Sequence, residues 1–237
     1  MNFSRAYISI FLPLILLFLA GCQPVIQLSS DPEVLKWETE IAGLVKLPVS
    51  TDPNTILFTG SSSIRLWNTI EEDMLPYKAV ARGYGGAKLN DYVYYCSGIT
   101  GPQSFGAAVV FIANDITGDS TDKSPEAVLH LMKQTVRLIR KSHPGVPVFW
   151  IEITPTPSRW KSWDKISAAN NLIMEYSKKR RHLFFISTSD RFLGADGKPL
   201  PELFQPDMLH LNEAGYRIWA DCIRQELDAE VPELKTN

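Results

Sequence analysis

From residue 55 onward the chain alternates between short apolar runs and longer amphipathic runs. The apolar runs are Thr55–Thr59, Ala79–Ala81, Ala107–Ala113, Pro147–Ile153 and Leu183–Ile186. The amphipathic runs, which predict helices, are Ile64–Leu75, Leu89–Ser97, Pro125–Lys141, Lys165–Arg181 and Asn212–Leu227. Strands that alternate with helices in this way predict an α/β domain, a three-layer α/β/α sandwich whose parallel sheet has about five strands.

The N-terminal residues have the pattern of an export signal. Arg5 precedes the apolar stretch Ala6–Ala20, whose length and flanks suit an export signal better than a membrane-spanning helix. Leu19-Ala20-Gly21-Cys22 resembles a bacterial lipobox. That resemblance implies cleavage before Cys22 and a lipid on its thiol. The alternative is an ordinary signal peptide with an incidental cysteine, because Ala20-Gly21 partly satisfies a small-residue cleavage site.

The predicted organisation follows from these two patterns. Residues 1–21 form a lipoprotein signal peptide, residues 22–30 a tether, and residues 31–237 one folded domain. Asp31 and Pro32 are typical of the first positions of a helix, so the domain is expected to begin there.

Composition narrows the classes of partner. The chain has 24 basic and 26 acidic residues, with no basic block, so we expect no nucleic-acid partner. No cysteine or histidine spacing resembles a zinc site, and no metal is expected. Cys96 and Cys222 lie in predicted helices. Buried free thiols are the favoured interpretation, and a disulfide in an exported protein is the alternative.

Polar loops follow the first three predicted strands. They are Gly60-Ser61-Ser62-Ser63, Gly83-Tyr84-Gly85-Gly86 and Asn114-Asp115. In an open α/β sheet the carboxyl ends of the strands meet at the edge where ligands bind, so these loops should converge.

Taken singly, each loop has an ordinary structural interpretation. The serine loop is neither a Gly-x-Ser-x-Gly elbow nor a phosphate loop, and such a sequence usually caps a helix. The glycine loop lacks the last glycine of the dinucleotide fingerprint, because Lys88 stands there, and it suits a tight turn. Asn114 suits a turn, although a side-chain amide at this edge can also donate to an oxyanion.

Four histidines compete for the role of a general base. His130 lies within a predicted helix, His143 precedes a proline and His182 ends a basic run. Only His210 has an acid, Asp207, three residues before it in a loop. A loop serine, a loop histidine and a neighbouring carboxylate are the parts of an activated nucleophile.

Together these residues resemble the SGNH hydrolases, also called the GDSL lipase/esterase family, from about Thr55 to about Leu227. The resemblance implies a flavodoxin-like fold and a serine esterase or acylhydrolase that needs no cofactor. It assigns Ser62 as nucleophile, His210 as base and Asp207 as its orienting acid. It also implies an oxyanion hole made by the backbone N–H groups of Ser62 and Gly86 and the amide of Asn114. Residues 31–237 would then be the SGNH hydrolase domain.

The chain departs from the family pattern at three places. Ser61 stands where aspartate is usual, Met208 stands where glycine is common, and the glycine that usually precedes the Asn114 motif is missing. These departures affect loop shape and pocket width more than the chemistry.

The substrate is not named by the sequence, which leaves a small-molecule or glycan ester. Arg65 and Arg159 could bind an anionic group or form salt bridges. Four aromatic side chains could line a sugar or acyl site, or pack the core: Trp67, Tyr84, Trp160 and Trp163. Two other functions remain open, a non-catalytic envelope lipoprotein that binds an acylated or glycan ligand and an acyltransferase.

The expected location is a bacterial cell envelope, with the protein held at a membrane by a lipid on Cys22. In a Gram-negative host this would be the outer membrane facing the periplasm, because residue 23 is Gln and not Asp.

Overall fold

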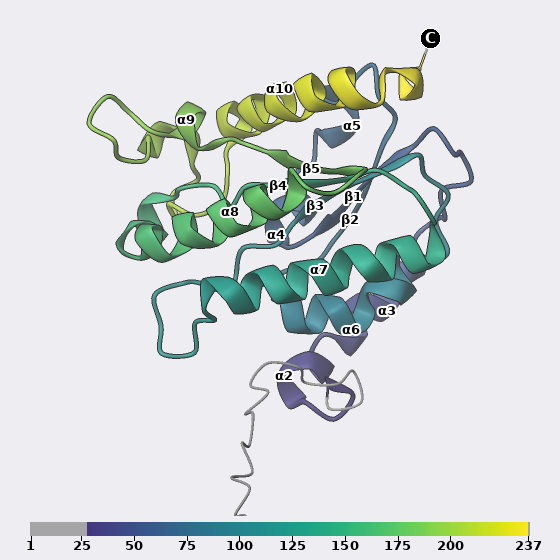
Figure 1. Cartoon of the computed structure of the whole chain (residues 1–237), viewed down its shortest axis with the longest axis horizontal. Coiled ribbons are helices and arrows are strands. Elements are labelled where there is room, and N and C mark those ends of the chain that lie inside the picture. Colours follow the sequence, from purple (N-terminus) through teal and green to yellow (C-terminus); the bar gives the residue numbers. More distant parts are fainter. Residues whose placement is uncertain (1–27, 237) are drawn as a thin grey trace, which may run out of the picture.

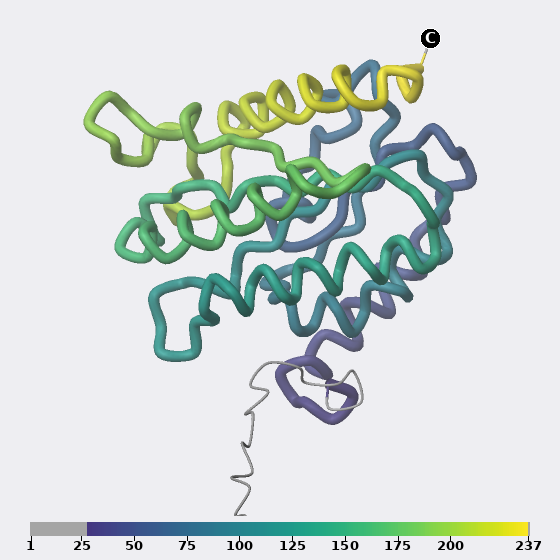
Figure 2. The backbone as a smooth tube through the Cα atoms, viewed as in Figure 1, coloured from purple at the N-terminus to yellow at the C-terminus, as the bar shows by residue number. Residues whose placement is uncertain are grey.

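The computed structural model describes residues 28–236 and contains one five-stranded sheet (Figures 1 and 2). The strands are β1 (Ile56–Gly60), β2 (Ala79–Gly83), β3 (Ala107–Phe111), β4 (Val148–Ile151) and β5 (Leu183–Ile186). They are all parallel and lie in the order β2-β1-β3-β4-β5. This confirms the predicted α/β class, and the order is that of flavodoxin-like folds, whose ligand crevice lies between β1 and β3.

Helices cover both faces of the sheet and make the three layers predicted (Figure 1). The helices α6 (Leu89–Thr100), α7 (Pro125–Ser142) and α8 (Trp163–Ser177) pack side by side on one face. The helices α5 (Ile70–Asp73) and α10 (Glu213–Glu230) lie on the other face. The shorter elements are α2 (Pro32–Leu35), α3 (Glu38–Val45), α4 (Ser62–Arg65), α9 (Ser189–Phe192), and the 3₁₀ turns η1 (Pro157–Ser162), η2 (Pro201–Leu203) and η3 (Pro232–Leu234).

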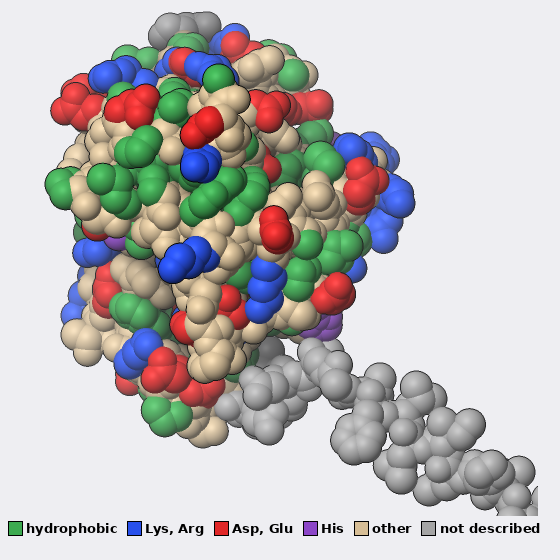
Figure 3. All heavy atoms as spheres, turned by 90° about the vertical axis from the view of Figure 1, so that its left-hand side faces the viewer, with side chains coloured by type: hydrophobic (Ala, Val, Ile, Leu, Met, Phe, Trp, Pro, Cys, Tyr) green, Lys and Arg blue, Asp and Glu red, His purple; other side chains and the backbone are tan. Residues whose placement is uncertain are grey.

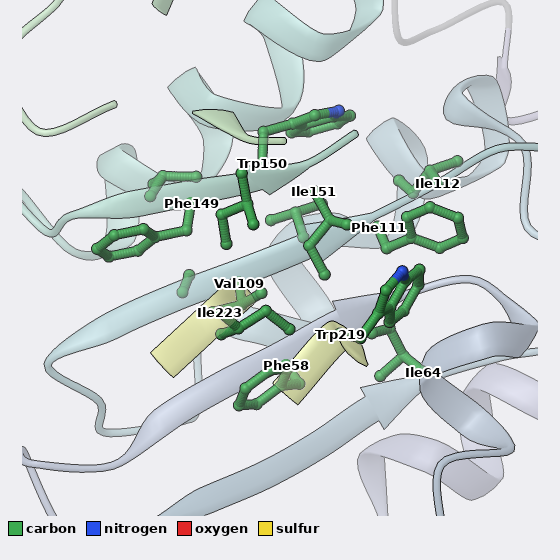
Figure 4. Close-up of a cluster of buried hydrophobic side chains, with 14 of the residues drawn as sticks. Phe58, Ile64, Val109, Phe111, Ile112, Phe149, Trp150, Ile151, Trp219 and Ile223 are labelled. Carbon is green, nitrogen blue, oxygen red and sulfur yellow. The ribbon is translucent and has the colours of Figure 1, made fainter. Parts of the chain in front are cut away.

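The central strands are buried along their whole length. Every residue of β1, β3 and β4 is buried, whereas the edge strands β2 and β5 are partly exposed. Side chains of these strands are covered on both faces, which explains their continuous apolar sequence. Figure 4 shows the packing on the α10 side, where Trp219 lies among Phe58, Ile64 and Phe111. The rings of Trp219 and Phe111 lie 4.6 Å apart.

One predicted helix, Ile64–Leu75, is wrong, because the structure breaks it into α4 and α5. Trp67 lies at the break, is 2% exposed and stacks on Tyr216 at 5.1 Å. Its indole Nε1 donates to Oδ2 of Asp73 at 2.7 Å, and Thr69 Oγ1 donates to the same oxygen at 2.6 Å. These side-chain contacts replace the regular helical turn, which the hydrophobic pattern alone does not reveal.

Two helix starts predicted from the sequence, at Asp31 and Asn212, are confirmed. Asp31 caps α2 by accepting from the N–H of Glu33 at 2.9 Å, and Asn212 caps α10 by accepting from Ala214 at 2.9 Å. Cys96 and Cys222 are both buried and free, as favoured from the sequence.

The described chain begins in contact with the domain. Leu28 is buried beside Val34 of α2 and Val93 of α6, and both α2 and α3 pack on α6. Cys22, the signal segment and most of the expected tether lie outside the described residues. Within residues 28–236 no helix has the length and apolar character needed to cross a membrane.

Candidate active site

Three consecutive serines follow β1, and only the middle one is open to solvent. Ser61 is 1% exposed and Ser63 is 9% exposed, whereas Ser62 is partly exposed. Before them, Gly60 has a φ of 131°, and a Cβ there would lie 2.0 Å from the carbonyl oxygen of Phe111. Only glycine fits this bend, which carries the chain from β1 into α4 and places Ser62 at the first position of that helix.

His210 and Asp207 form a continuous hydrogen-bonded chain with this serine. The Oγ of Ser62 lies 2.9 Å from Nε2 of His210, and Nδ1 of His210 lies 2.6 Å from Oδ2 of Asp207. Because an ionised carboxylate only accepts, Nδ1 carries the ring hydrogen and Nε2 is free to accept from the Ser62 hydroxyl. The arrangement is that of a nucleophile, a base and an orienting acid.

The turn between the acid and the histidine explains one departure from the family pattern. Met208 has a φ of 57°, a left-handed conformation that costs a side-chain-bearing residue about 1–2 kcal/mol. The turn lets the Oδ1 of Asp207 accept from the N–H groups of Leu209 at 2.9 Å and His210 at 3.0 Å. Glycine would adopt this conformation more readily, yet methionine here keeps the turn intact.

Two opposing effects set the charge of Asp207. Partial burial raises the pKa of its carboxyl, but the hydrogen bonds from His210 and Leu209 together outweigh burial and hold the pKa below its usual range. Asp207 therefore stays ionised at neutral pH and places a negative charge beside the imidazole ring of His210.

Asn114 lies where β3 has ended, and its amide is held at both ends. Its Nδ2 donates to the carbonyl of Ala87 at 2.9 Å, and its Oδ1 accepts from Nη2 of Arg159 at 2.5 Å. Because a guanidinium can only donate, Arg159 fixes which end of the amide is the nitrogen. One of the two Nδ2 hydrogens is bound to Ala87, and the other is available to a ligand.

The sequence did not predict that Arg159 binds the side-chain amide of Asn114. Its Nη1 also donates to the carbonyl of Ala113 at 2.8 Å. Within residues 28–236, no carboxylate lies close enough to form an ion pair with it, so the salt-bridge alternative from the sequence is wrong for Arg159. Burial lowers the pKa of Arg159, and the charges of Asp122 and Asp115 oppose this shift. Its position after β4 was a usable signal, because it places a fourth loop at the same edge of the sheet.

Gly86 lies in the loop that joins β2 to α6. Its φ is 66°, which favours glycine, and the next residue is Ala87, whose carbonyl binds Asn114. The end of this loop is held by Asp91, which accepts from Lys88 N–H at 3.1 Å and from the hydroxyl of Tyr84 at 2.5 Å. Burial is the main cause that raises the pKa of Asp91 to about 6.

A small cavity of about 20 Å³ lies beside Ser62. The side chains around it come from the ends of β1, β3 and β4, from the His210 loop and from α10. They include Ser62, Asn114, Thr154, Arg159, Leu209, His210 and Trp219, whereas Gly86 is not part of the lining. Figure 3 views the molecule from this side, where hydrophobic side chains lie among acidic and basic ones and neither charge dominates.

The aromatic candidates separate into two groups. Trp67 and Tyr84 are buried in the core, at 2% and 0% exposure, so core packing was the right alternative for both. Trp160 and Trp163 are partly exposed and stack on each other at 5.8 Å, directly after Arg159. Among the described residues, no group of three His, Cys, Asp or Glu side chains is arranged to hold a metal ion.

The same segment of chain that carries these residues matches a known family model. Residues 62–218 match the GDSL-like Lipase/Acylhydrolase family. The chain belongs to this family. The resemblance stated from the four sequence motifs is thereby confirmed. A search of curated proteins found no match to the sequence.

Several solved structures have the same fold as this chain. A Bacteroides fragilis protein assigned as an acylhydrolase is 19% identical with a TM-score of 0.69, covering 84% of this chain and 97% of its own. A GDSL-like lipase from Bacteroides thetaiotaomicron is also 19% identical, with a TM-score of 0.64 and coverage of 83% and 97%. A carbohydrate esterase family 3 protein from Talaromyces cellulolyticus is 15% identical, with a TM-score of 0.59 and coverage of 76% and 98%. At these identities the likeness concerns the fold.

Proposed function

We propose that this GDSL family member is a serine esterase that cleaves carboxylic esters with short acyl groups. The observation that carries the proposal is the chain of hydrogen bonds from Ser62 through His210 to Asp207, at 2.9 Å and 2.6 Å. His143, by contrast, contacts the backbone carbonyl of Gln103 at 2.8 Å.

The mechanism follows from the direction of these hydrogen bonds. Ser62 Oγ attacks the acyl carbon while its proton moves to Nε2 of His210. The ester C–O bond then breaks, and His210 returns the proton to the leaving alcohol. Water repeats the sequence in the second half and releases the acid from Ser62. Asp207 orients the imidazole and stabilises its cation throughout, without taking the proton.

The carbonyl oxygen becomes negative in each tetrahedral intermediate, and three groups are proposed to stabilise it. They are the N–H of Ser62 at the start of α4, the N–H of Gly86 and the Nδ2 of Asn114. Donors that are already aligned cost little reorganisation during the reaction and can contribute several kcal/mol. The hydrogen bonds that Asn114 makes to Ala87 and Arg159 support this role, because they leave one amide hydrogen unused.

The preference for a short acyl group is proposed from the size of the cavity. A volume of about 20 Å³ beside Ser62 has room for about one or two water-sized groups, which suits the methyl of an acetyl ester better than a long chain. The Talaromyces carbohydrate esterase, which shares the fold, makes acetylated sugars a reasonable class to assay first.

The test uses the three adjacent serines. Ser62→Ala should lower hydrolysis of p-nitrophenyl acetate by about 10³-fold or more with little change in melting temperature. Ser61→Ala and Ser63→Ala are the matched controls and should keep the reaction. Activity should fall from acetate to longer esters, and a fluorophosphonate should label Ser62. Labelling of another serine, or an intact protein that binds acetylated ligands without turnover, would contradict the proposal.

We also propose that a lipid on Cys22 holds the enzyme at a membrane of a bacterial envelope. The support is the sequence Leu19-Ala20-Gly21-Cys22. Cys22→Ser should move the exported protein from the membrane fraction to the soluble fraction. If the variant stays in the membrane fraction through salt and carbonate washes, the lipid anchor is wrong.

A further inference from the structure

The segment that precedes the family region reaches the proposed oxyanion loop. The family model begins at residue 62, and both α2 and α3 lie before it, with α3 ending at Val45. These helices pack on α6, the helix that follows the loop from Gly83 to Lys88, which we call the oxyanion loop. Two side chains of this segment, Trp37 and Glu40, contact the loop directly.

Glu40 binds the backbone of the oxyanion loop. Its Oε1 accepts from the N–H of Gly85 at 2.9 Å, across 45 residues of chain. Gly85 is the residue immediately before Gly86, and its carbonyl carbon belongs to the same peptide unit as the Gly86 N–H. The bond from Glu40 fixes the preceding planar peptide unit, Tyr84–Gly85, so only the φ and ψ of Gly85 remain between this fixed unit and the Gly86 N–H.

The ring of Trp37 lies against Gly86. A Cβ at Gly86 would lie 3.0 Å and 3.2 Å from carbons of the Trp37 ring, which is tighter than ordinary contact. The Trp37 ring also packs edge-on against the buried ring of Tyr84, with the centroids 5.6 Å apart. Trp37 therefore contacts the residues on both sides of Gly85, and its ring fills the space beside the left-handed backbone of Gly86.

The rest of the loop is held by different groups. Tyr84 N–H donates to the carbonyl of Gly60 at 3.0 Å, and Asp91 holds Lys88 at the other end. Between these two fixed points, the carboxylate of Glu40 accepts a hydrogen bond from the backbone of Gly85. The contacts from α3 thus act on the part of the loop that would donate to the oxyanion.

We propose that Trp37 and Glu40 are positioning residues of the oxyanion hole. They hold the Gly86 N–H in the direction that receives the developing negative charge, without touching the substrate themselves. The proposal rests on the proposed function, because the oxyanion role of Gly86 belongs to it. Loss of alignment weakens an interaction made mainly in the transition state, so kcat should fall while KM changes little.

The test compares two variants of Glu40 in the full chain with a control on the same helix. Glu40→Ala removes the acceptor and should lower kcat for p-nitrophenyl acetate about tenfold, a part of what loss of a whole donor costs. Glu40→Gln keeps an acceptor and should stay within a few-fold of wild type. Glu38→Ala, an exposed position two residues earlier, should behave as wild type.

Trp37 offers a second, independent pair. Trp37→Ala should lower kcat about tenfold with KM within a few-fold, and Trp37→Phe should recover most of it by restoring an aromatic ring over Gly86. The rate of Ser62 labelling by a fluorophosphonate should fall in parallel in Glu40→Ala and Trp37→Ala, because the phosphoryl oxygen occupies the same hole.

The outcomes separate this proposal from the esterase proposal. A wild-type protein without esterase activity and without Ser62 labelling would overturn both. Normal wild-type activity with Glu40→Ala and Trp37→Ala lowering only the melting temperature would overturn the positioning role alone. A large rise in KM with unchanged kcat would also overturn it, because it would place these residues in substrate binding.

Discussion

Arg159→Met tests whether the amide of Asn114 is held in place for catalysis. Methionine keeps an unbranched apolar side chain but removes the donors to Asn114 Oδ1 at 2.5 Å and to the Ala113 carbonyl at 2.8 Å. The amide of Asn114 would then keep only its bond to Ala87 and could rotate, so its free Nδ2 hydrogen would no longer point consistently at the oxyanion.

The loss of the whole Asn114 donor sets an upper limit on how far Arg159→Met can lower kcat. Loss of one oxyanion donor typically costs about 10²–10³-fold in kcat, or roughly 3–4 kcal/mol, and Asn114→Ala should show that loss. If Arg159 acts through Asn114, its removal cannot cost more than this. We expect Arg159→Met to lower kcat by about 10–10²-fold with KM within a few-fold, since misalignment removes only part of the donor. Arg159→Lys should be intermediate, because an ammonium cannot reach both acceptors as a fork.

The assay is a double-mutant cycle on kcat, using Asn114→Ala, Arg159→Met and the double variant with p-nitrophenyl acetate. In the Asn114→Ala background, Arg159→Met should have little further effect, because the group it positions is gone. Melting temperatures of all four proteins provide the control for folding.

Three results would refute this reasoning. Additive losses would mean that Arg159 acts independently of Asn114. A rise mainly in KM for Arg159→Met would mean that the guanidinium binds the substrate directly. If Asn114→Ala lowers melting temperature and spares kcat, Asn114 is a turn residue and the oxyanion role is wrong.

Two further predictions concern pH. First, the hydrogen bonds to Asp207 lower the pKa of its carboxyl, so kcat/KM should show no limb from Asp207 between about pH 5 and 8; Asp207→Asn should cost less than His210→Ala, because Asp207 does not take the proton, and the reverse order would contradict these roles. Second, burial raises the pKa of Asp91 to about 6, so the native state binds a proton that the unfolded state releases above about pH 4. The free energy of unfolding should fall by about 2 kcal/mol from pH 4 to 7 through this group. Asp91→Asn should remove that dependence in denaturant titrations, and an unchanged dependence would contradict the assignment.

The fold, and the meeting of the candidate residues at one edge of the sheet, were predictable because local sequence patterns carry them. Continuous apolar runs such as Ala107–Ala113 mark strands buried on both faces, and loops at their carboxyl ends must meet at one edge. That rule brought Ser62 and Asn114 to the same crevice, and Asp207 near His210 in sequence singled out one histidine.

The supporting contacts were not predictable, because they join residues with no local signature. Glu40 binds Gly85 across 45 residues, and Arg159 binds Asn114 across an equal separation. A glutamate on a short amphipathic helix and an arginine in a proline-rich loop each have many possible partners until the elements are packed. The break at Trp67 was missed for a similar reason, because its contacts to Tyr216 and Asp73 are tertiary.

The burial of Leu28 has a consequence for how a surface-bound enzyme would search for substrate. Five residues lie between Cys22 and Leu28, and even a fully extended chain over that distance spans only about 20 Å. With a lipid on Cys22, α2 and the α6 surface beside it would be kept close to the bilayer (Figure 1). The edge of the sheet that carries Ser62 lies at another side of the molecule, so the cavity beside Ser62 would open along the membrane. Such an enzyme would search for esters in two dimensions, within a thin layer above the lipid.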